Sequence, residues 1–167
     1  MTSPVVVLVG APGAGKSTVG RLVAERLGVS FRDTDADIVA EAGKPISEIF
    51  YDDGEPHFRA LESSAVSRAL AEHDGVLALG GGAVLSAGTR EELLGRTVVF
   101  LDIGMAAAAR RVGLARDRPV ITLNPRAMLH SLLAERRPLY EQVATHVVEV
   151  DNQTADQVAE SVLKAIR

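Results

Sequence analysis

Short apolar runs and amphipathic stretches alternate along the whole chain. The first run, residues 5–9, contains only valine and leucine, which is typical of a parallel strand covered on both faces. Later runs are shorter, but each is bounded by polar or glycine residues. The predicted strands are residues 5–9, 29–32, 76–79, 97–101 and 146–150.

Helical patterns fill the intervals between these strands. Residues 16–27 carry an apolar stripe at helical spacing, and Gly28 is predicted to end that helix. Residues 52–54 are predicted as a turn. Capping signals are Ser47, Asn124 before Pro125, and the capping-box pairs Thr89–Glu92 and Thr154–Gln157. The predicted helices are residues 16–27, 35–42, 47–50, 55–72, 106–112, 125–137 and 155–166, with a short one after Thr89.

Strands that alternate with helices predict a parallel sheet with helices on both of its faces. The expected fold is α/β, with three layers (α/β/α) and a five-stranded parallel sheet. No linker or repeat divides the chain, so residues 1–167 are predicted to form a single domain. Ligands in such folds bind at the carboxyl ends of the strands, where the candidate residues below are found.

The segment after the first strand reads G-A-P-G-A-G-K-S-T at residues 10–18, which matches the pattern G-x-x-x-x-G-K-[ST]. Its glycines allow backbone N–H groups to curve around phosphate oxygens, and the helix that follows directs its positive end to the anion. Lys16 can reach the β- and γ-phosphates, and the Ser17 hydroxyl can ligate Mg²⁺. The sequence therefore predicts a P-loop that binds a nucleoside triphosphate.

Composition and charge limit the cellular location and the partners that we expect for this protein. No run approaches the length of a membrane span and no charged and apolar leader precedes the first strand, so neither a span nor a signal peptide is expected. The chain contains no cysteine, which excludes disulfides and thiolate metal sites and is consistent with the cytoplasm. The net charge of −4 argues against a nucleic-acid partner. No long apolar surface stripe indicates a dimer, so a monomer is expected.

Charge is distributed unevenly along the chain. Residues 104–140 contain seven arginines, no lysine and two acidic residues, so this segment carries +5 against −9 for the rest. Arginine without lysine favours anion recognition over a solvated helix face. Within the segment, residues 113–124 lack periodicity, and a loop of that length is usually functional.

Several classes of P-loop protein compete. A GTPase switch would carry N-K-x-D, which is absent, and the chain is short for an ATP-driven motor module. A small-molecule kinase needs an acceptor pocket and a lid that excludes water, and this chain has candidates for both. A regulatory module that binds nucleotide without turnover is a further alternative, although the presence of Lys16, Ser17, Asp35 and Arg118 argues against it.

Candidate acceptor residues follow two other strands. Asp33 and Asp35 share one side if their segment is extended, so one carboxylate can hold a water of the Mg²⁺ shell while the other accepts a hydrogen bond from a hydroxyl. The alternative for this pair is a helix N-cap. Three glycines, residues 80–82, follow the strand at 76–79 and permit very close approach of a ligand to the backbone.

In order and spacing, these motifs resemble the shikimate kinase family over essentially the whole chain. The matching segments are residues 10–18, D-T-D at 33–35, G-E-x-x-F-R-x-x-E at 54–62, G-G-G-A at 80–83, R-P at 118–119 and R-x-P-L-Y at 136–140. The resemblance implies a P-loop kinase that uses ATP and Mg²⁺ to phosphorylate the 3-hydroxyl of shikimate, giving shikimate 3-phosphate for chorismate and aromatic amino acid biosynthesis. It also implies a shikimate-binding helical region at about 33–62 and a lid at about 113–124. A kinase for another polyol acid, such as gluconate, is the alternative that the D-T-D and triple-glycine set disfavours.

The resemblance also assigns roles to individual residues. Asp35 would hydrogen-bond the acceptor hydroxyl as the nearest base, and Lys16 and Arg118 would stabilise the transferred phosphoryl group. Ser17 would ligate Mg²⁺ directly and Asp33 through a water. The implied substrate-binding residues are Asp35, Arg59, Gly80, Gly81, Gly82 and Arg136. The implied ATP-binding residues are Gly13, Ala14, Gly15, Lys16, Ser17, Thr18, Arg111, Arg118 and Gln153.

Other polar residues are interpreted as structural or solvated. Asp102 ends a strand as a metal-binding carboxylate would, but Asp33 can supply that function, so Asp102 is interpreted as structural. The spacing to Pro-Leu-Tyr selects Arg136 as the ligand, which leaves Arg137 interpreted as solvated. The histidines, at 57, 73, 130 and 146, show no metal-ligand spacing.

Overall fold

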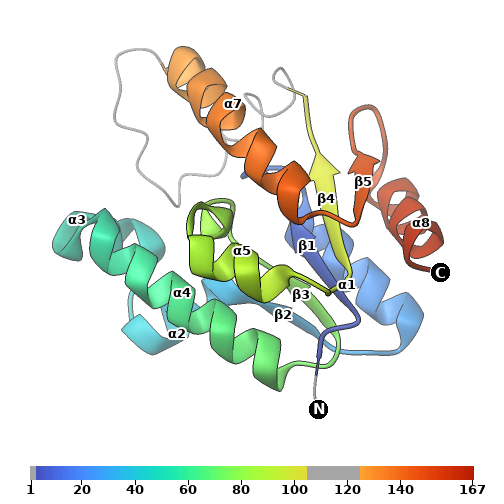
Figure 1. The fold of residues 1–167 in the computed structure, drawn as a ribbon, viewed down its shortest axis with the longest axis horizontal. Helices are drawn as coiled ribbons and strands as arrows, with labels where there is room; N and C mark the ends of the chain where they lie inside the picture. The colour runs from blue at the N-terminus through green and yellow to red at the C-terminus, as the bar shows by residue number, and fades with distance from the viewer. Residues whose placement is uncertain (1–2, 105–124) are drawn as a thin grey trace.

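The computed structural model describes residues 3–104 and 125–167, which form a layered α/β fold around one parallel sheet (Figure 1). The strands are β1 (Val6–Val9), β2 (Phe31–Asp33), β3 (Val76–Ala78), β4 (Val98–Asp102) and β5 (His146–Glu149). Their order is β2-β3-β1-β4-β5, and every pairing is parallel. Val7 of the central strand is in register with Leu77 on one side and Val98 on the other. The predicted five-stranded parallel sheet is confirmed.

Helices cover both faces of the sheet. The helices are α1 (Lys16–Leu27), α2 (Thr34–Ala42), α3 (Ile46–Asp53), α4 (Glu55–Glu72), η1 (Ala83–Leu85), α5 (Ala87–Leu93), α7 (Pro125–Val143) and α8 (Ala155–Ile166). One apolar core joins the sheet to α1 and α8, and a second joins its other face to α4, α5 and α7. In Figure 1 these two groups lie on opposite sides of the strands, so the three predicted layers are confirmed. No helix in the described part of the chain is long and apolar enough to cross a membrane.

Local end signals explain several helix bounds. Gly28 ends α1 in the left-handed conformation at φ 69°, and Thr154 and Gln157 form the predicted capping box of α8. The predicted cap at Thr89 is wrong, because Ser86 accepts a hydrogen bond from the Thr89 N–H and Thr89 is buried. The predicted cap at Ser47 is also wrong.

Burial moves the start of α3 ahead of Ser47. This helix begins at Ile46, directly after Pro45, so that Ile46 and Ile49 both enter a small core with Phe58. It also runs through residues 52 and 53, so the predicted turn there reduces to Gly54, which ends the helix at φ 86°. Pro45 suits the start of a helix because its φ is fixed near the helical value.

Helix α7 is longer than predicted. Its predicted end was about Arg137, since a proline follows, but the helix continues through Pro138 to Val143. Tyr140 and Val143 are buried against β4 and β3 residues, and burial of these side chains outweighs the one backbone hydrogen bond that a proline cannot make. The predicted helix 106–112, the lid 113–124 and the cap at Asn124 lie outside the described residues.

Candidate active site

The P-loop connects β1 to α1 at the carboxyl edge of the sheet. Gly13 and Gly15 have φ of 84° and 91°, a region that glycine alone adopts readily, which explains why glycine is needed there. The Lys16 Nζ donates to the carbonyl oxygens of Gly10 and Ala11 at 2.7 and 2.9 Å. The loop therefore holds an ammonium group beside the positive end of α1, an arrangement that suits phosphate.

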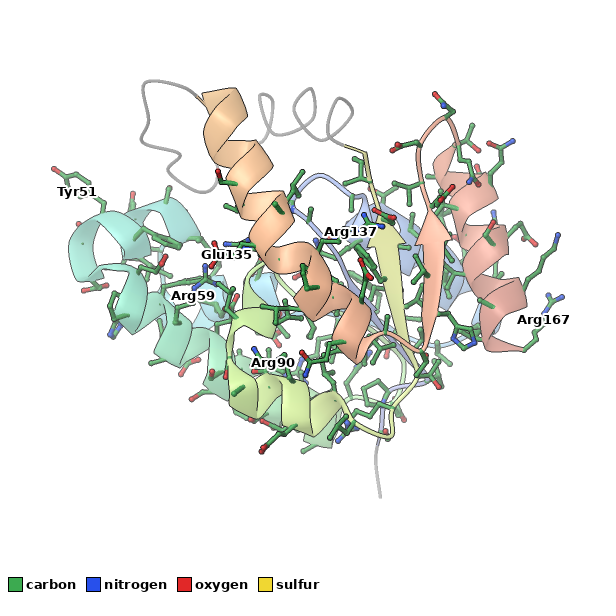
Figure 2. All side chains as sticks on the ribbon, turned by 45° about the horizontal axis from the view of Figure 1, so that its top comes forward. Tyr51, Arg59, Arg90, Glu135, Arg137 and Arg167 are labelled. Atoms are coloured by element: carbon green, nitrogen blue, oxygen red, sulfur yellow. The ribbon has the colours of Figure 1, made fainter. Side chains whose placement is uncertain are left out.

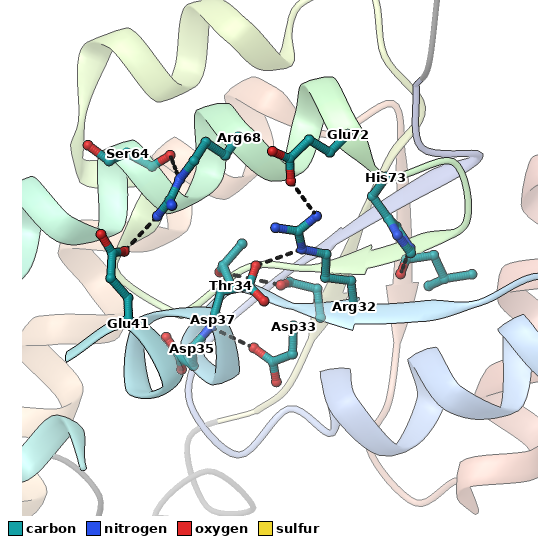
Figure 3. A network of polar contacts seen from close by, with 12 residues as sticks. Arg32, Asp33, Thr34, Asp35, Asp37, Glu41, Ser64, Arg68, Glu72 and His73 are labelled. Carbon is teal, nitrogen blue, oxygen red and sulfur yellow. Dashed lines mark hydrogen bonds and ion pairs between the residues drawn. The ribbon is translucent and has the colours of Figure 1, made fainter. Parts of the chain in front are cut away.

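Asp33 links the P-loop to the segment that follows β2. Its Oδ2 accepts a hydrogen bond from Ser17 Oγ at 2.8 Å. Its Oδ1 accepts one from the Asp35 N–H at 2.9 Å (Figure 3). The expectation that Asp33 and Asp35 share one side of an extended segment is wrong, because α2 begins at Thr34 and Asp33 is its N-cap. The N-cap alternative is correct, and the same carboxylate also contacts the P-loop.

A charged network fixes α2, the helix whose first turn carries Asp35. Arg32 of β2 pairs with Asp37 at 2.7 Å and with Glu72 of α4 at 3.0 Å, and Arg68 of α4 pairs with Glu41 at 2.6 Å (Figure 3). Burial opposes the charge of Arg32, but its hydrogen bonds to the two carboxylates raise its pKa overall. Asp35 itself is half-buried, with Oδ1 shielded from solvent. The network thus anchors the acceptor-side carboxylate to β2 and α4.

The triple-glycine segment lies between the P-loop and two other elements. A Cβ on Gly81 would lie 2.8 Å from Pro12 Cδ, and one on Gly82 would collide with the Arg59 guanidinium. The Gly81 carbonyl accepts a hydrogen bond from Tyr140 Oη of α7 at 2.5 Å. The Pro12 ring therefore leaves no room for a side chain at position 81, and a side chain at position 82 would displace the Arg59 guanidinium. The segment contacts both α4 and α7.

Arg59 of α4 reaches the carboxyl edge of the sheet, where its guanidinium lies against Gly82, and Arg136 lies on α7, the helix that contacts Gly81 through Tyr140. Arg59 of α4 pairs with Glu62 at 2.7 Å, and the Glu62 side chain is only 4% exposed. The Arg59 Nε is buried without a hydrogen-bond partner among the described residues. Arg136 of α7 is buried as well, at 9% exposure. Guanidinium groups that are buried or partly buried are suited to bind a carboxylate.

The role of Glu62 was missed in the sequence. The motif at residues 54–62 includes this glutamate, but no role was given to it. Glu62 lies three residues after Arg59 on a helix, and this spacing could have predicted their contact. A buried carboxylate that pairs with Arg59 fixes the direction of that guanidinium.

A cavity of about 310 Å³ adjoins the other side of the P-loop. Its walls include the P-loop glycines, Thr18, Gln153 and Val158, so the structure places Gln153 beside the predicted ATP residues. The Gln153 Nε2 donates to the Glu149 carbonyl at 2.7 Å, and Asn152 before it adopts φ 60°. The two other predicted ATP residues, Arg111 and Arg118, lie outside the described residues.

Arg137 was interpreted from the sequence as a solvated side chain, and the structure shows that this interpretation is wrong. Its guanidinium makes two hydrogen bonds to Asp102 at the end of β4, at 2.6 and 2.7 Å. Asp102 therefore has a structural partner, and the hydrogen bonds that it accepts raise the pKa of Arg137. His57 is exposed, and among the side chains that the structure describes no group of three or more acidic or histidine residues is arranged to hold a metal.

Comparisons with known proteins agree over nearly the whole chain. Residues 12–167 match the family model described as Shikimate kinase. The shikimate kinase of Salinispora tropica is 60% identical over 94% of this chain and 94% of its own length, and that of Streptomyces coelicolor is 53% identical over 99% and 97%. The solved structure of shikimate kinase from Acinetobacter baumannii in complex with shikimate superposes with a TM-score of 0.93 at 36% identity, covering 99% of this chain and 93% of that one.

Proposed function

We infer the roles of the site residues from one premise: the chain belongs to the shikimate kinase family. Its activity is ATP-dependent phosphorylation of the 3-hydroxyl of shikimate, which gives shikimate 3-phosphate. One observation supports placing the reaction at this site. Asp33 accepts a hydrogen bond from Ser17 with one carboxylate oxygen and from the Asp35 N–H with the other. A single carboxylate thus joins the phosphate side of the site to the acceptor side.

On the phosphate side, residues 13–18 bind the triphosphate of ATP, and Lys16 neutralises charge on the β- and γ-phosphates. Gln153 borders the nucleotide through the cavity beside the P-loop. The roles of Arg111 at the adenine and of Arg118 at the transferred phosphoryl group stay predictions from the resemblance.

On the acceptor side, Asp35 accepts a hydrogen bond from the 3-hydroxyl and orients its oxygen for in-line attack on the γ-phosphorus. Arg59 and Arg136 bind the shikimate carboxylate, and the Gly80–Gly82 backbone lines its ring. That the enzyme acts as a monomer in the cytoplasm, and that residues 1–167 form one domain, stay predictions from the sequence.

The residues at the start of α1 fit a magnesium ion. Ser17 Oγ and Asp33 Oδ2 are neutral and anionic oxygen donors that lie 2.8 Å apart beside the P-loop, and Mg²⁺ prefers a few such oxygens together with phosphates and waters. When bound, Mg²⁺ would neutralise phosphate charge. Ser17 would contact it directly and Asp33 through a water.

A Ser17→Ala variant is expected to raise the Mg²⁺ concentration needed for half-maximal activity about tenfold, because a ligand is lost and Asp33 loses a hydrogen-bond donor. Titration of activity with Mg²⁺ at fixed ATP measures this shift. Ser64→Ala on the exposed side of α4 is the matched control and should leave the titration unchanged. An unchanged titration for Ser17→Ala would rule out the direct contact.

An Arg136→Ala variant is expected to raise the KM for shikimate about tenfold or more, because a charge-assisted contact to its carboxylate is lost. The KM for ATP should change by less than about twofold, since ATP binds on the other side of Asp33. Steady-state kinetics with each substrate varied in turn gives both constants. Equal increases in the two KM values would contradict the placement of Arg136.

Gluconate is the alternative acceptor that deserves a direct comparison. A gluconokinase from Sinorhizobium meliloti superposes with a TM-score of only 0.58 at 23% identity, which shows a shared fold and nothing about the acceptor. The shikimate-bound relative superposes far more closely. Shikimate is therefore the acceptor that we propose, with Arg59, Gly81 and Arg136 as its binding residues.

A further inference from the structure

Arg137 makes several contacts on the β4 side of α7. Figure 2 shows it there, whereas Arg59 lies on the other side of that helix. Its Nη1 and Nη2 donate to the two carboxylate oxygens of Asp102, its Nε lies 2.9 Å from Glu141 Oε1, and its guanidinium lies 5.6 Å from the centre of the Phe100 ring. Asp102 is the last residue of β4, which pairs with β1, the strand that leads into the P-loop. This two-bond pair therefore fixes α7 relative to the phosphate side of the site.

Pro138 interrupts the hydrogen bonding of helix α7 next to Arg137. Pro138 has no N–H, so the Ala134 carbonyl cannot receive the usual helical hydrogen bond, and the proline ring crowds that carbonyl. Prolines are the commonest cause of a sharp kink in a helix. Arg136 and Arg137 both lie in the turn that Pro138 interrupts, so a change of bend there would move the Arg136 guanidinium.

Two long-range contacts hold this turn from both ends. Arg137 binds Asp102 before the proline, and Tyr140 donates to the Gly81 carbonyl after it. The rings of Tyr140 and Phe100 lie 5.1 Å apart, which joins the two contacts through one packed cluster. Neighbouring residues of an α-helix project about 100° apart. The rotation of α7 that seats Arg137 on Asp102 therefore also determines the direction of Arg136.

We propose that Arg137 is a positioning residue for the shikimate carboxylate: its pair with Asp102 holds the turn before Pro138 and thereby orients the buried Arg136. The inference rests on the proposed role of Arg136. Arg137 itself touches no substrate in this account. Loss of the pair therefore weakens shikimate binding through a misplaced Arg136 and leaves ATP binding unaltered.

Arg26 provides a matched control for the loss of an ion pair. It joins α1 to α8 through Asp156 and Glu160, and its side chain is 30% exposed against 51% for Arg137. The Arg26 pairs lie away from the proposed substrate residues, so we expect their loss to change the melting temperature and to leave both KM values unchanged. Arg137→Lys is the conservative variant, because lysine keeps the charge but cannot form two parallel hydrogen bonds to one carboxylate.

The experiment compares Arg137→Ala, Arg137→Lys, Asp102→Asn, Arg136→Ala and Arg26→Ala in the enzyme of residues 1–167. Steady-state kinetics gives the KM for shikimate and for ATP, calorimetry gives the Kd for shikimate without nucleotide, and thermal unfolding gives the Tm. We expect Arg137→Ala and Asp102→Asn to raise the KM and Kd for shikimate about tenfold with less than about a twofold change in the KM for ATP. Arg137→Lys should fall between these variants and the native enzyme. Arg26→Ala should lower the Tm only.

The outcomes separate this inference from the proposed function. If Arg136→Ala raises the KM for shikimate while Arg137→Ala, Arg137→Lys and Asp102→Asn behave like Arg26→Ala, the positioning role is overturned and the proposed function stands. If Arg136→Ala leaves the KM for shikimate unchanged, the proposed carboxylate site fails, and the positioning role fails with it. Should Arg137→Ala not fold, the lysine and asparagine variants provide the same comparison.

Discussion

A Lys16→Met variant is expected to lose about 10³-fold in kcat, the largest effect of any single substitution in this site. The Lys16 ammonium already lies inside the P-loop, where it donates to the carbonyls of Gly10 and Ala11. Methionine fills a similar volume without the charge. Phosphoryl transfer depends mostly on positioning and on charge neutralisation, so loss of this cation removes stabilisation of the transition state.

The measurement is a coupled assay of ADP release at saturating ATP, Mg²⁺ and shikimate. Lys164→Met on the exposed side of α8 carries the same substitution away from the P-loop and should retain full turnover. A thermal unfolding curve for each variant separates loss of charge from loss of folded protein. Turnover of Lys16→Met within tenfold of the native enzyme would contradict the role given to this lysine.

An Asp35→Asn variant is expected to lower kcat by roughly 10²- to 10³-fold with little change in either KM. The amide keeps the size of the side chain, but it cannot accept the proton of the 3-hydroxyl and is a weaker hydrogen-bond acceptor. Because the interaction strengthens as the hydroxyl attacks, its loss affects kcat more than binding.

Asp37→Asn is the matched control for this substitution. Both carboxylates lie in the first turn of α2, where negative charge stabilises the helix, but Asp37 pairs with Arg32 at 2.7 Å. We expect Asp37→Asn to lower the Tm and to lower kcat far less than Asp35→Asn does, because Arg32 keeps its pair with Glu72. If the two variants lose kcat equally, the effect belongs to the helix terminus and Asp35 has no special role.

Much of the fold follows from local patterns in the sequence. The bounds of α1, the capping box of α8 and the five parallel strands were all predicted, because apolar periodicity, glycine ends and capping pairs act over a few residues. The P-loop was predicted for the same reason, since its motif is contiguous.

The errors arise where burial or a local hydrogen bond overrides a pattern. Helix α7 continues past Arg137 because Tyr140 and Val143 enter the core, although a proline normally argues for an end. Asp33 and Asp35 were expected to share one side of an extended segment, but the Asp33 side chain caps α2, which begins at Thr34. The end of α7 and the start of α2 are therefore determined by the free energy of particular contacts, which the spacing of residues in the sequence does not show.

The contacts that assemble the site were the least predictable. Ser17 and Asp33 are 16 residues apart, Tyr140 and Gly81 are 59 apart, and Asp102 and Arg137 are 35 apart. Periodicity cannot detect such pairs, because they depend on the order of strands in the sheet. The resemblance to a family supplied residue roles, but the partners of Arg137 and Glu62 emerged only from the structure.

The measurement that tests the central claim most directly is ADP release by the native enzyme with ATP and Mg²⁺, in the presence of shikimate, of gluconate, or of no acceptor. The account predicts rapid release with shikimate alone, because we assign its 3-hydroxyl to Asp35, its ring to the Gly81 backbone and its carboxylate to Arg59 and Arg136. Release of equal rate with gluconate, or without any acceptor, would contradict the account and leave only the nucleotide site standing.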